Sequence, residues 1–185
     1  MALKATIHKA QIQLADMDRH VYTDIAVTIA RHPSENDERM MIRLLALALG
    51  WPQDTSEGTL EFAKDMWEPD EPALWQKNFS DEILHWVEVG QPDDKRLMKA
   101  SGRARQVSLW AFQSSTPIWW DGIVNKVTRA SNLTVWQVPS EQSQALAKLA
   151  QRTMQLQITV QDGTVWVNDG SESLEITPQR LMGED

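Results

Sequence analysis

Three acidic side chains stand where the surrounding pattern is apolar or turn-like. Glu38 falls in the middle of the apolar stripe of a helix predicted from Met40 to Leu49. Glu88 lies near the end of the apolar strand pattern 83–89, where a charge is costly unless it is paired or bound to a metal. Asp70 belongs to the acidic, proline-punctuated loop 67–72. These three carboxylates are the first candidates for chemistry.

Carboxylate oxygens of this kind suit magnesium. Mg²⁺ takes hard oxygen ligands and keeps several waters, so two or three carboxylates are enough to hold it. The ion lowers the pKa of a bound water and neutralises charge on a phosphate. Each acid also has a plainer interpretation. Glu38 can be exposed to solvent and interact favourably with the helix dipole. Glu88 can reach water at a strand end, and Asp70 can lie in a solvated turn.

A basic helix face follows Glu88 in the sequence. Pro92 is well placed to open a helix that runs to about Arg105. Four cations fall on one face of it, opposite Leu97, Ala100 and Ala104; they are Lys95, Arg96, Lys99 and Arg103. The alternative is a solvated basic face, but this is the one clear basic cluster in an acidic sequence.

Several familiar sites are missing from the sequence. It contains no cysteine, which excludes disulfides, thiolate metal sites and a cysteine nucleophile. There is no glycine-rich phosphate loop, no H-E-x-x-H pair and no G-x-S-x-G elbow. The histidines show no metal-ligand spacing, and the nine tryptophans are scattered in a way more typical of packing than of a binding platform.

Composition indicates a soluble, cytoplasmic protein with one domain over 1–185. The 185 residues suit one core, and no apolar run predicts a membrane span or a signal peptide. The net charge is −8, so the global field repels nucleic acid. A nucleic-acid partner therefore needs a local patch or a bound cation, and the alternative partner is a protein. We expect a monomer.

Periodicity predicts an α/β (α+β) fold with one mixed sheet. Strands at 2–14 and 21–30 form an N-terminal hairpin, followed by a helix that Ser34 caps, with Asp37 in a capping box, and that Gly50 ends. Two βαβ units follow, and a C-terminal hairpin turns at Asp162-Gly163. The remaining predicted elements are short strands at 60–64 and 74–76, strands at 83–89, 107–112 and 133–138, and helices at about 116–129 and 140–151.

The order of helical Glu, Pro-Asp, strand Glu and basic crossover helix resembles the core of PD-(D/E)xK nucleases, in which acids hold Mg²⁺ and a lysine orients the attacking water. More closely, nearly all of the chain resembles the YaeQ family of bacterial proteins, which implies the nuclease-like fold without a settled activity. The segments that carry this resemblance are Met1-Ala-Leu-Lys-Ala-Thr-Ile7, Ala30-Arg-His-Pro-Ser-Glu35, Glu38-Arg-Met-Met-Ile-Arg-Leu-Leu45, Asp70-Glu-Pro72, Trp86-Val-Glu-Val-Gly90, Pro92-Asp93, Arg152-Thr-Met154 and Gln161-Asp-Gly163.

The chain departs from the nuclease pattern at Gly90, where a lysine is wanted. Either Lys99 on the next helix replaces it, or Gln91 does, or the site is not a nuclease. The literal Pro-Asp pair is supplied by Pro69-Asp70 or Pro92-Asp93. Asp81 is a further candidate acid near the start of the Glu88 strand.

Two functions follow from these residues. The first is a Mg²⁺-dependent nuclease, with Mn²⁺ able to substitute, in which Glu38, Asp70 and Glu88 hold the metal and Lys99 or Gln91 positions water or phosphate. The second is a nuclease-like fold without catalysis that serves as a binding or regulatory module. The first predicts that the carboxylates of Glu38 and Glu88 face one another across a cleft.

Overall fold

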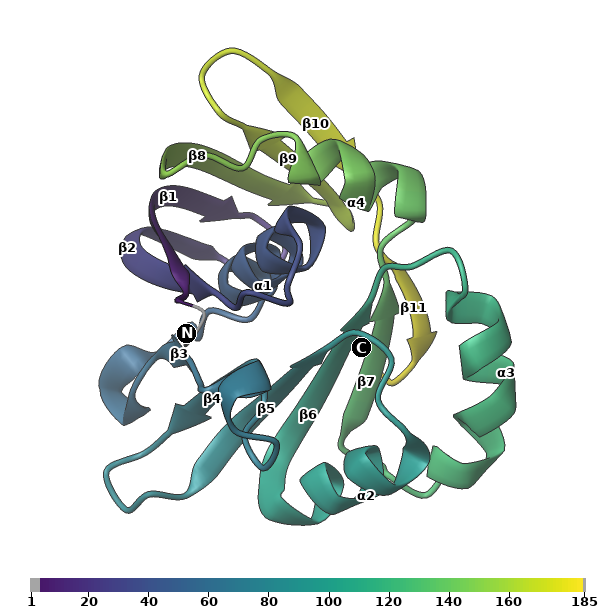
Figure 1. The fold of residues 1–185 in the computed structure, drawn as a ribbon. Coiled ribbons are helices and arrows are strands. Elements are labelled where there is room, and N and C mark those ends of the chain that lie inside the picture. The colour runs from purple at the N-terminus through teal and green to yellow at the C-terminus, as the bar shows by residue number, and fades with distance from the viewer. Residues whose placement is uncertain (1–3, 185) are drawn as a thin grey trace. The chain divides into compact units, whose positions relative to one another are not determined.

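The computed structural model describes residues 4–184, which divide into two compact units (Figure 1). Unit 1 comprises the described residues up to Gln53 together with Glu141–Pro178. Unit 2 comprises Asp54–Ser140 and the described residues from Gln179 onward. The fold is mixed α+β, but it has two mixed sheets within residues 4–184, so the expectation of one sheet is wrong. That all of 1–185 forms one domain stays a prediction.

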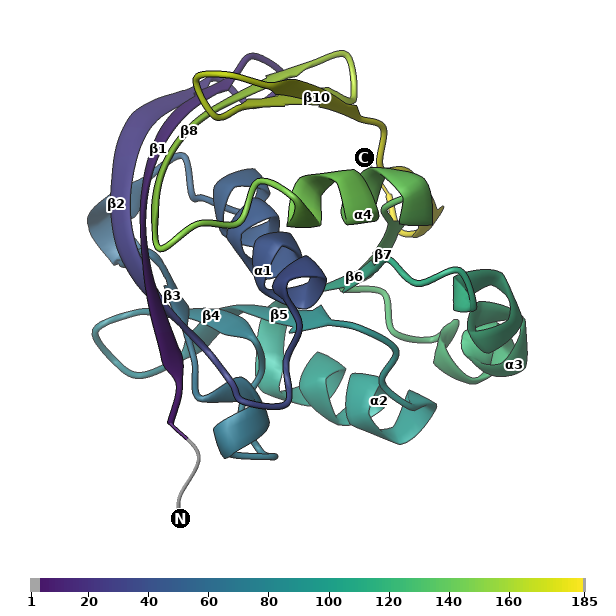
Figure 2. The same cartoon turned by 45° about the horizontal axis from the view of Figure 1, so that its top comes forward.

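Unit 1 is built on a five-stranded sheet with the order β10-β9-β8-β1-β2. Figure 2 shows this sheet curling around α1 and α4. Its elements are β1 (Thr6–Asp16), β2 (Val21–Arg31), α1 (Asp37–Leu49), α4 (Ser140–Ala147, which starts at the unit boundary), β8 (Thr153–Gln161), β9 (Thr164–Asn168) and β10 (Ser173–Ile176).

Both predicted hairpins are confirmed in this sheet. β1 pairs antiparallel with β2, and β8 pairs antiparallel with β9. Asp162 and Gly163 both have positive φ, 52° and 76°, as a tight hairpin turn requires. The unforeseen feature is that β8 pairs parallel with β1. The C-terminal hairpin therefore joins the N-terminal one, because both bury apolar faces that need a common core.

The N-cap of helix α1 lies two residues after the predicted cap, Ser34. Its N-cap is Asn36, whose side-chain oxygen accepts from the Arg39 N–H at 2.9 Å. Ser34 is not the cap, because a turn closed by the Glu35 N–H on the His32 carbonyl at 2.9 Å takes up that position. Gly50 ends the helix as predicted.

Unit 2 is built on a six-stranded sheet with the order β11-β7-β6-β5-β4-β3. Its elements are the short 3₁₀ helices η1 (Thr55–Glu57) and η2 (Asp65–Trp67), the strands β3 (Leu60–Phe62), β4 (Leu74–Lys77), β5 (Ile83–Val89), β6 (Ala104–Ala111), β7 (Leu133–Gln137) and β11 (Gln179–Met182), and the helices α2 (Asp94–Arg103) and α3 (Thr116–Val127).

The predicted βαβ units are confirmed, since β5, β6 and β7 run parallel. Helix α2 buries Leu97 and Ala100 in a cluster with Trp86, Val107 and Leu109 from the sheet. This packing fixes the polar face of α2 over the end of β5. Within residues 4–184, no helix is both long and apolar enough to cross a lipid bilayer.

Candidate functional site

Glu88 is a buried, paired carboxylate near the carboxyl end of β5. Only 5% of the residue is exposed. Its Oε1 accepts two hydrogen bonds, from Trp86 Nε1 at 2.8 Å and from Arg96 Nε at 2.8 Å. Burial raises the pKa of Glu88, while the Arg96 charge and the Trp86 hydrogen bond act against that rise. The side chain is thus a desolvated acid held by one cation.

Arg96 ties the acidic loop to this strand end. Besides Glu88, its guanidinium donates to the backbone carbonyl of Pro69 through Nη1, and to that of Glu71 through Nη2 at 2.9 Å. Its own backbone N–H donates to the N-cap Asp93 at 2.8 Å. One side chain from α2 therefore gathers the loop and the buried acid into one cluster.

Asp70 and Lys99 meet at the rim of the cluster. Lys99 Nζ lies 3.8 Å from Asp70 Oδ1, with 67% and 78% of the two side chains exposed. Arg103 stacks over the Trp86 ring, 5.0 Å from its centroid, and donates to the Asp70 carbonyl at 3.5 Å. The predicted basic face of α2 does point at the acidic loop, although an exposed ion pair of this kind contributes little stability.

The backbone at Gly90 disfavours the lysine that the nuclease pattern wants there. Gly90 has a φ of +118°, a conformation that residues with a Cβ rarely adopt, so a lysine there would be strained. A Cβ at this position would meet nothing within 4 Å, so the constraint comes from the backbone. Gln91 donates from Nε2 to Ser115 Oγ at 2.9 Å and to Thr116 Oγ1 at 3.4 Å. Its amide is turned toward the start of α3.

Two of the alternative acids have other roles. Asp93 caps α2, so its carboxylate is committed to the helix terminus. Asp81 is exposed in the turn before β5, at the far end of the strand from Glu88, and lies 3.5 Å from Lys77. Of the two Pro-Asp pairs, Pro69-Asp70 is therefore the one that approaches the Glu88 cluster.

Glu38 belongs to unit 1, in the first turn of α1. It is half-buried, and its Oε2 accepts from Ser143 Oγ of α4 at 3.1 Å. Glu88 belongs to unit 2. The expectation that these two carboxylates face one another across a cleft stays a prediction.

The oxygens near Arg96 are of the kind that magnesium prefers. They are the Glu88 carboxylate and the carbonyls of Pro69 and Glu71, with the exposed Asp70 carboxylate beside them. The donor type fits a divalent cation. In the described part of the chain, however, no three His, Asp or Glu side chains form a ready metal-binding group. In this structure the positive charge among these oxygens is a guanidinium.

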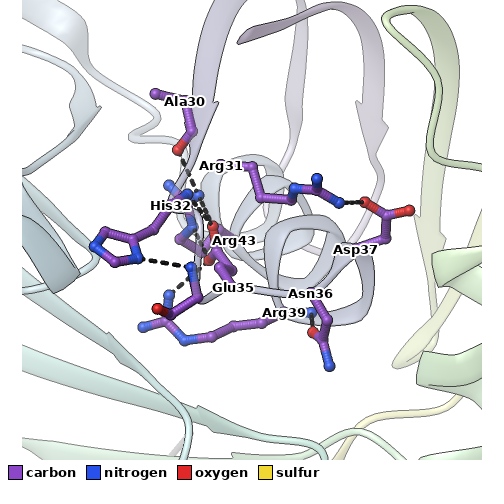
Figure 3. Close-up of polar contacts among 9 residues, drawn as sticks. Ala30, Arg31, His32, Glu35, Asn36, Asp37, Arg39 and Arg43 are labelled. Carbon is purple, nitrogen blue, oxygen red and sulfur yellow. Dashed lines mark hydrogen bonds and ion pairs between the residues drawn. The ribbon is translucent and has the colours of Figure 1, made fainter. Parts of the chain in front are cut away.

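A second charged cluster, which the sequence reasoning missed, lies where β2 leads into α1 (Figure 3). The Glu35 carboxylate is fully buried and accepts from Arg43 Nη2 at 2.5 Å, Arg43 Nε at 2.8 Å and Arg39 Nη1 at 2.7 Å. Arg43 also donates to the Ala30 carbonyl at 3.0 Å. The signal was an acid followed by arginines four and eight residues later. These contacts hold the start of α1 against the end of β2, which is a structural role.

Comparisons with known proteins cover most of the chain. It is 44% identical over 177 residues to the uncharacterized protein YaeQ of Salmonella typhi and 42% identical to that of Escherichia coli K12, with 95% of each chain covered. The crystal structure of YaeQ from Xanthomonas axonopodis pv. citri superposes with a TM-score of 0.91 at 36% identity, covering 97% of this chain and 99% of that one. YaeQ from Pseudomonas syringae gives 0.90 at 39% identity, covering 97% of each.

The family assignment follows from the length of these matches. The sequence model described as YaeQ protein matches residues 1–178. Together with the relatives and the two crystal structures, this shows that the chain belongs to the YaeQ family.

Proposed function

We propose that this protein is a Mg²⁺-dependent nuclease of the PD-(D/E)xK type with a variant site at the carboxyl end of β5. The observation that carries the proposal is the buried Glu88, at a strand end onto which an acidic Pro-Asp loop and a basic helix converge. Ligands of open α/β sheets bind beyond the carboxyl ends of their strands.

The residues have distinct roles in this proposal. Glu88 and Asp70, both in unit 2, hold Mg²⁺ or Mn²⁺. That Glu38 is a third ligand stays a prediction from the sequence. The ion, when bound, supplies a low-pKa water and neutralises charge on the scissile phosphate. Lys99 is exposed beside Asp70 and pairs with the phosphate backbone. Gln91 takes the place of the missing lysine in orienting water at the same strand end.

A cleavage assay tests this function. Labelled single- and double-stranded DNA and RNA are incubated with the protein in Mg²⁺, Mn²⁺ or EDTA. We expect cleavage that needs the metal and falls about a hundredfold in Glu88→Gln. The matched control is Glu82→Gln, which makes the same change at an exposed acid paired with Arg105. Absence of cleavage on every substrate with both metals would refute the proposal.

A second candidate is a non-catalytic binding or regulatory module, for which nucleic acid or a protein is the partner. The Arg96–Glu88 ion pair favours it, because a cation from the chain already neutralises the buried acid. Thermal melts in EDTA and in millimolar Mg²⁺ or Mn²⁺ separate the two. A midpoint that no metal moves, together with a destabilised Glu88→Gln, supports the module. A cytoplasmic location and a monomeric state stay predictions.

A further inference from the structure

We propose that Arg96 occupies the cation position of this site, so that the Arg96–Glu88 ion pair and a divalent ion on Oε1 of Glu88 exclude one another. Arg96 then acts as a gate on metal binding. This inference rests on the proposed function only in supposing that a divalent ion is the competing ligand.

The first step is the convergence of oxygens on one guanidinium. Nε of Arg96 meets Glu88 Oε1 at 2.8 Å, Nη1 meets the Pro69 carbonyl, and Nη2 meets the Glu71 carbonyl at 2.9 Å. A carboxylate and two carbonyls from separate segments thus face the same positive charge. Oxygens arranged around a cation in this way are the ligand type of Mg²⁺ and Mn²⁺.

The second step is that Glu88 Oε1 has no room for both cations. That oxygen already accepts from the indole N–H of Trp86 as well as from Arg96. A metal ligated by the same oxygen would stand where the guanidinium stands, and two positive charges at that distance repel. Metal binding there requires Arg96 to leave.

The third step is that Arg96 has a route out. One third of its side chain, 33%, is exposed, whereas Glu88 is 7% exposed at the side chain. The guanidinium can turn into water while α2 stays packed through Leu97 and Ala100. The buried Glu88 cannot follow, and without a cation it would stand as a lone buried charge. Departure of Arg96 is therefore favourable only when another cation or a proton neutralises Glu88.

The exchange would also release the loop. Arg96 holds the carbonyls of Pro69 and Glu71, which flank Asp70. When Arg96 turns out, these two carbonyl oxygens become available beside the exposed Asp70 carboxylate. Apparent metal affinity is then the intrinsic affinity multiplied by the fraction of molecules with Arg96 turned out.

The experiment is a titration of the full-length protein with MnCl₂ alone, followed by isothermal calorimetry or by the EPR signal of free Mn²⁺. We expect Arg96→Met to bind Mn²⁺ at least about tenfold more tightly than wild type. The matched control Lys95→Met removes an exposed charge from the same helix and should leave the affinity unchanged. Adding Glu88→Gln to Arg96→Met should abolish the gain. Equal or weaker Mn²⁺ binding by a folded Arg96→Met overturns the inference.

A measurement on the wild-type protein avoids the case in which loop 67–72 rearranges in Arg96→Met. The Nε–H resonance of Arg96, assigned by its loss in Arg96→Lys, is followed by ¹⁵N NMR as Mg²⁺ is added. We expect the hydrogen-bonded signal to shift or exchange away as metal binds. Mg²⁺ binding that leaves it in place overturns the exclusion. If Mn²⁺ displaces Arg96 as expected but no nucleic acid is cleaved, the proposed nuclease function is refuted and this inference stands.

Discussion

Glu35 is a buried carboxylate in the ion-paired cluster at the start of α1. Its side chain is fully buried and that of Arg43 is 4% exposed. Glu35→Gln leaves the Arg43 charge in the interior without its anion, which costs roughly 3–5 kcal/mol of unfolding free energy. Urea denaturation measures the change.

Asp37→Asn is the control for this prediction. Asp37 pairs with Arg31 at 2.5 Å, but 45% of its side chain is exposed, so we expect a loss below about 1 kcal/mol. Equal losses in the two variants would contradict the large cost expected for the buried Glu35–Arg43 pair.

Glu88 should leave a signature in the pH dependence of stability. Its pKa is raised above the ordinary 4.5 because the folded state disfavours the charged form. Between the unfolded and folded pKa values the native state binds more protons, so its contribution to stability is present at lower pH and is lost as pH rises through the folded pKa. The free energy of unfolding, measured by urea denaturation from pH 4 upward, should fall in the wild type relative to Glu88→Gln. A constant difference between them would contradict the raised pKa.

The residues of the site were only partly foreseeable. A charge inside the apolar run 83–89 marked Glu88, and its burial follows the pattern. The apolar run 83–89 does not indicate which cation pairs with Glu88, because the position of α2 along β5 depends on how Leu97 and Ala100 pack against the sheet. Lys99 was one candidate to replace the missing lysine of the site, but the packing brings Arg96 to Glu88 and Lys99 to Asp70.

At the scale of elements, the start of α1 provides a sharp test of capping. Asn36→Ala removes the side chain that accepts from the Arg39 N–H and should cost about 1 kcal/mol. Ser34→Ala, at the cap that the sequence favoured, should be nearly neutral because Ser34 is exposed and lies outside the helix. Chemical denaturation of both variants measures the difference. A larger loss of unfolding free energy in Ser34→Ala than in Asn36→Ala would show that Ser34 is the N-cap.

Elements with strong local signals were predicted and those without them were not. The two βαβ units follow from apolar runs separated by helical periodicity, and both have the expected parallel pairing. The edge strands β10 and β11 are four residues each and carry little periodicity. Pairing of β1 with β8 joins residues 144 apart, such as Gln13 and Gln157, and nothing local in either strand announces it.

For the whole molecule, hydrogen exchange should reveal two separate centres of protection. In unit 1 the strands flanked on both sides include β1 and β8, and in unit 2 they include β5 and β6. Their amides should exchange slowest, while the edge strands β2, β10, β3 and β11 should exchange sooner. Exchange followed by mass spectrometry measures this. Protection confined to one of the two sheets would show that the other is not independently ordered.

The parallel pairing of β1 with β8 has a consequence for synthesis on the ribosome. The β1–β2 hairpin emerges early with its apolar face formed by residues such as Ile12 and Leu14, but its partner is made 144 residues later. At bacterial elongation rates of about 5–20 residues per second, the hairpin waits roughly 7 to 30 s. Meanwhile the whole of segment 54–140 is extruded. The nascent chain therefore exposes an incomplete sheet for many seconds.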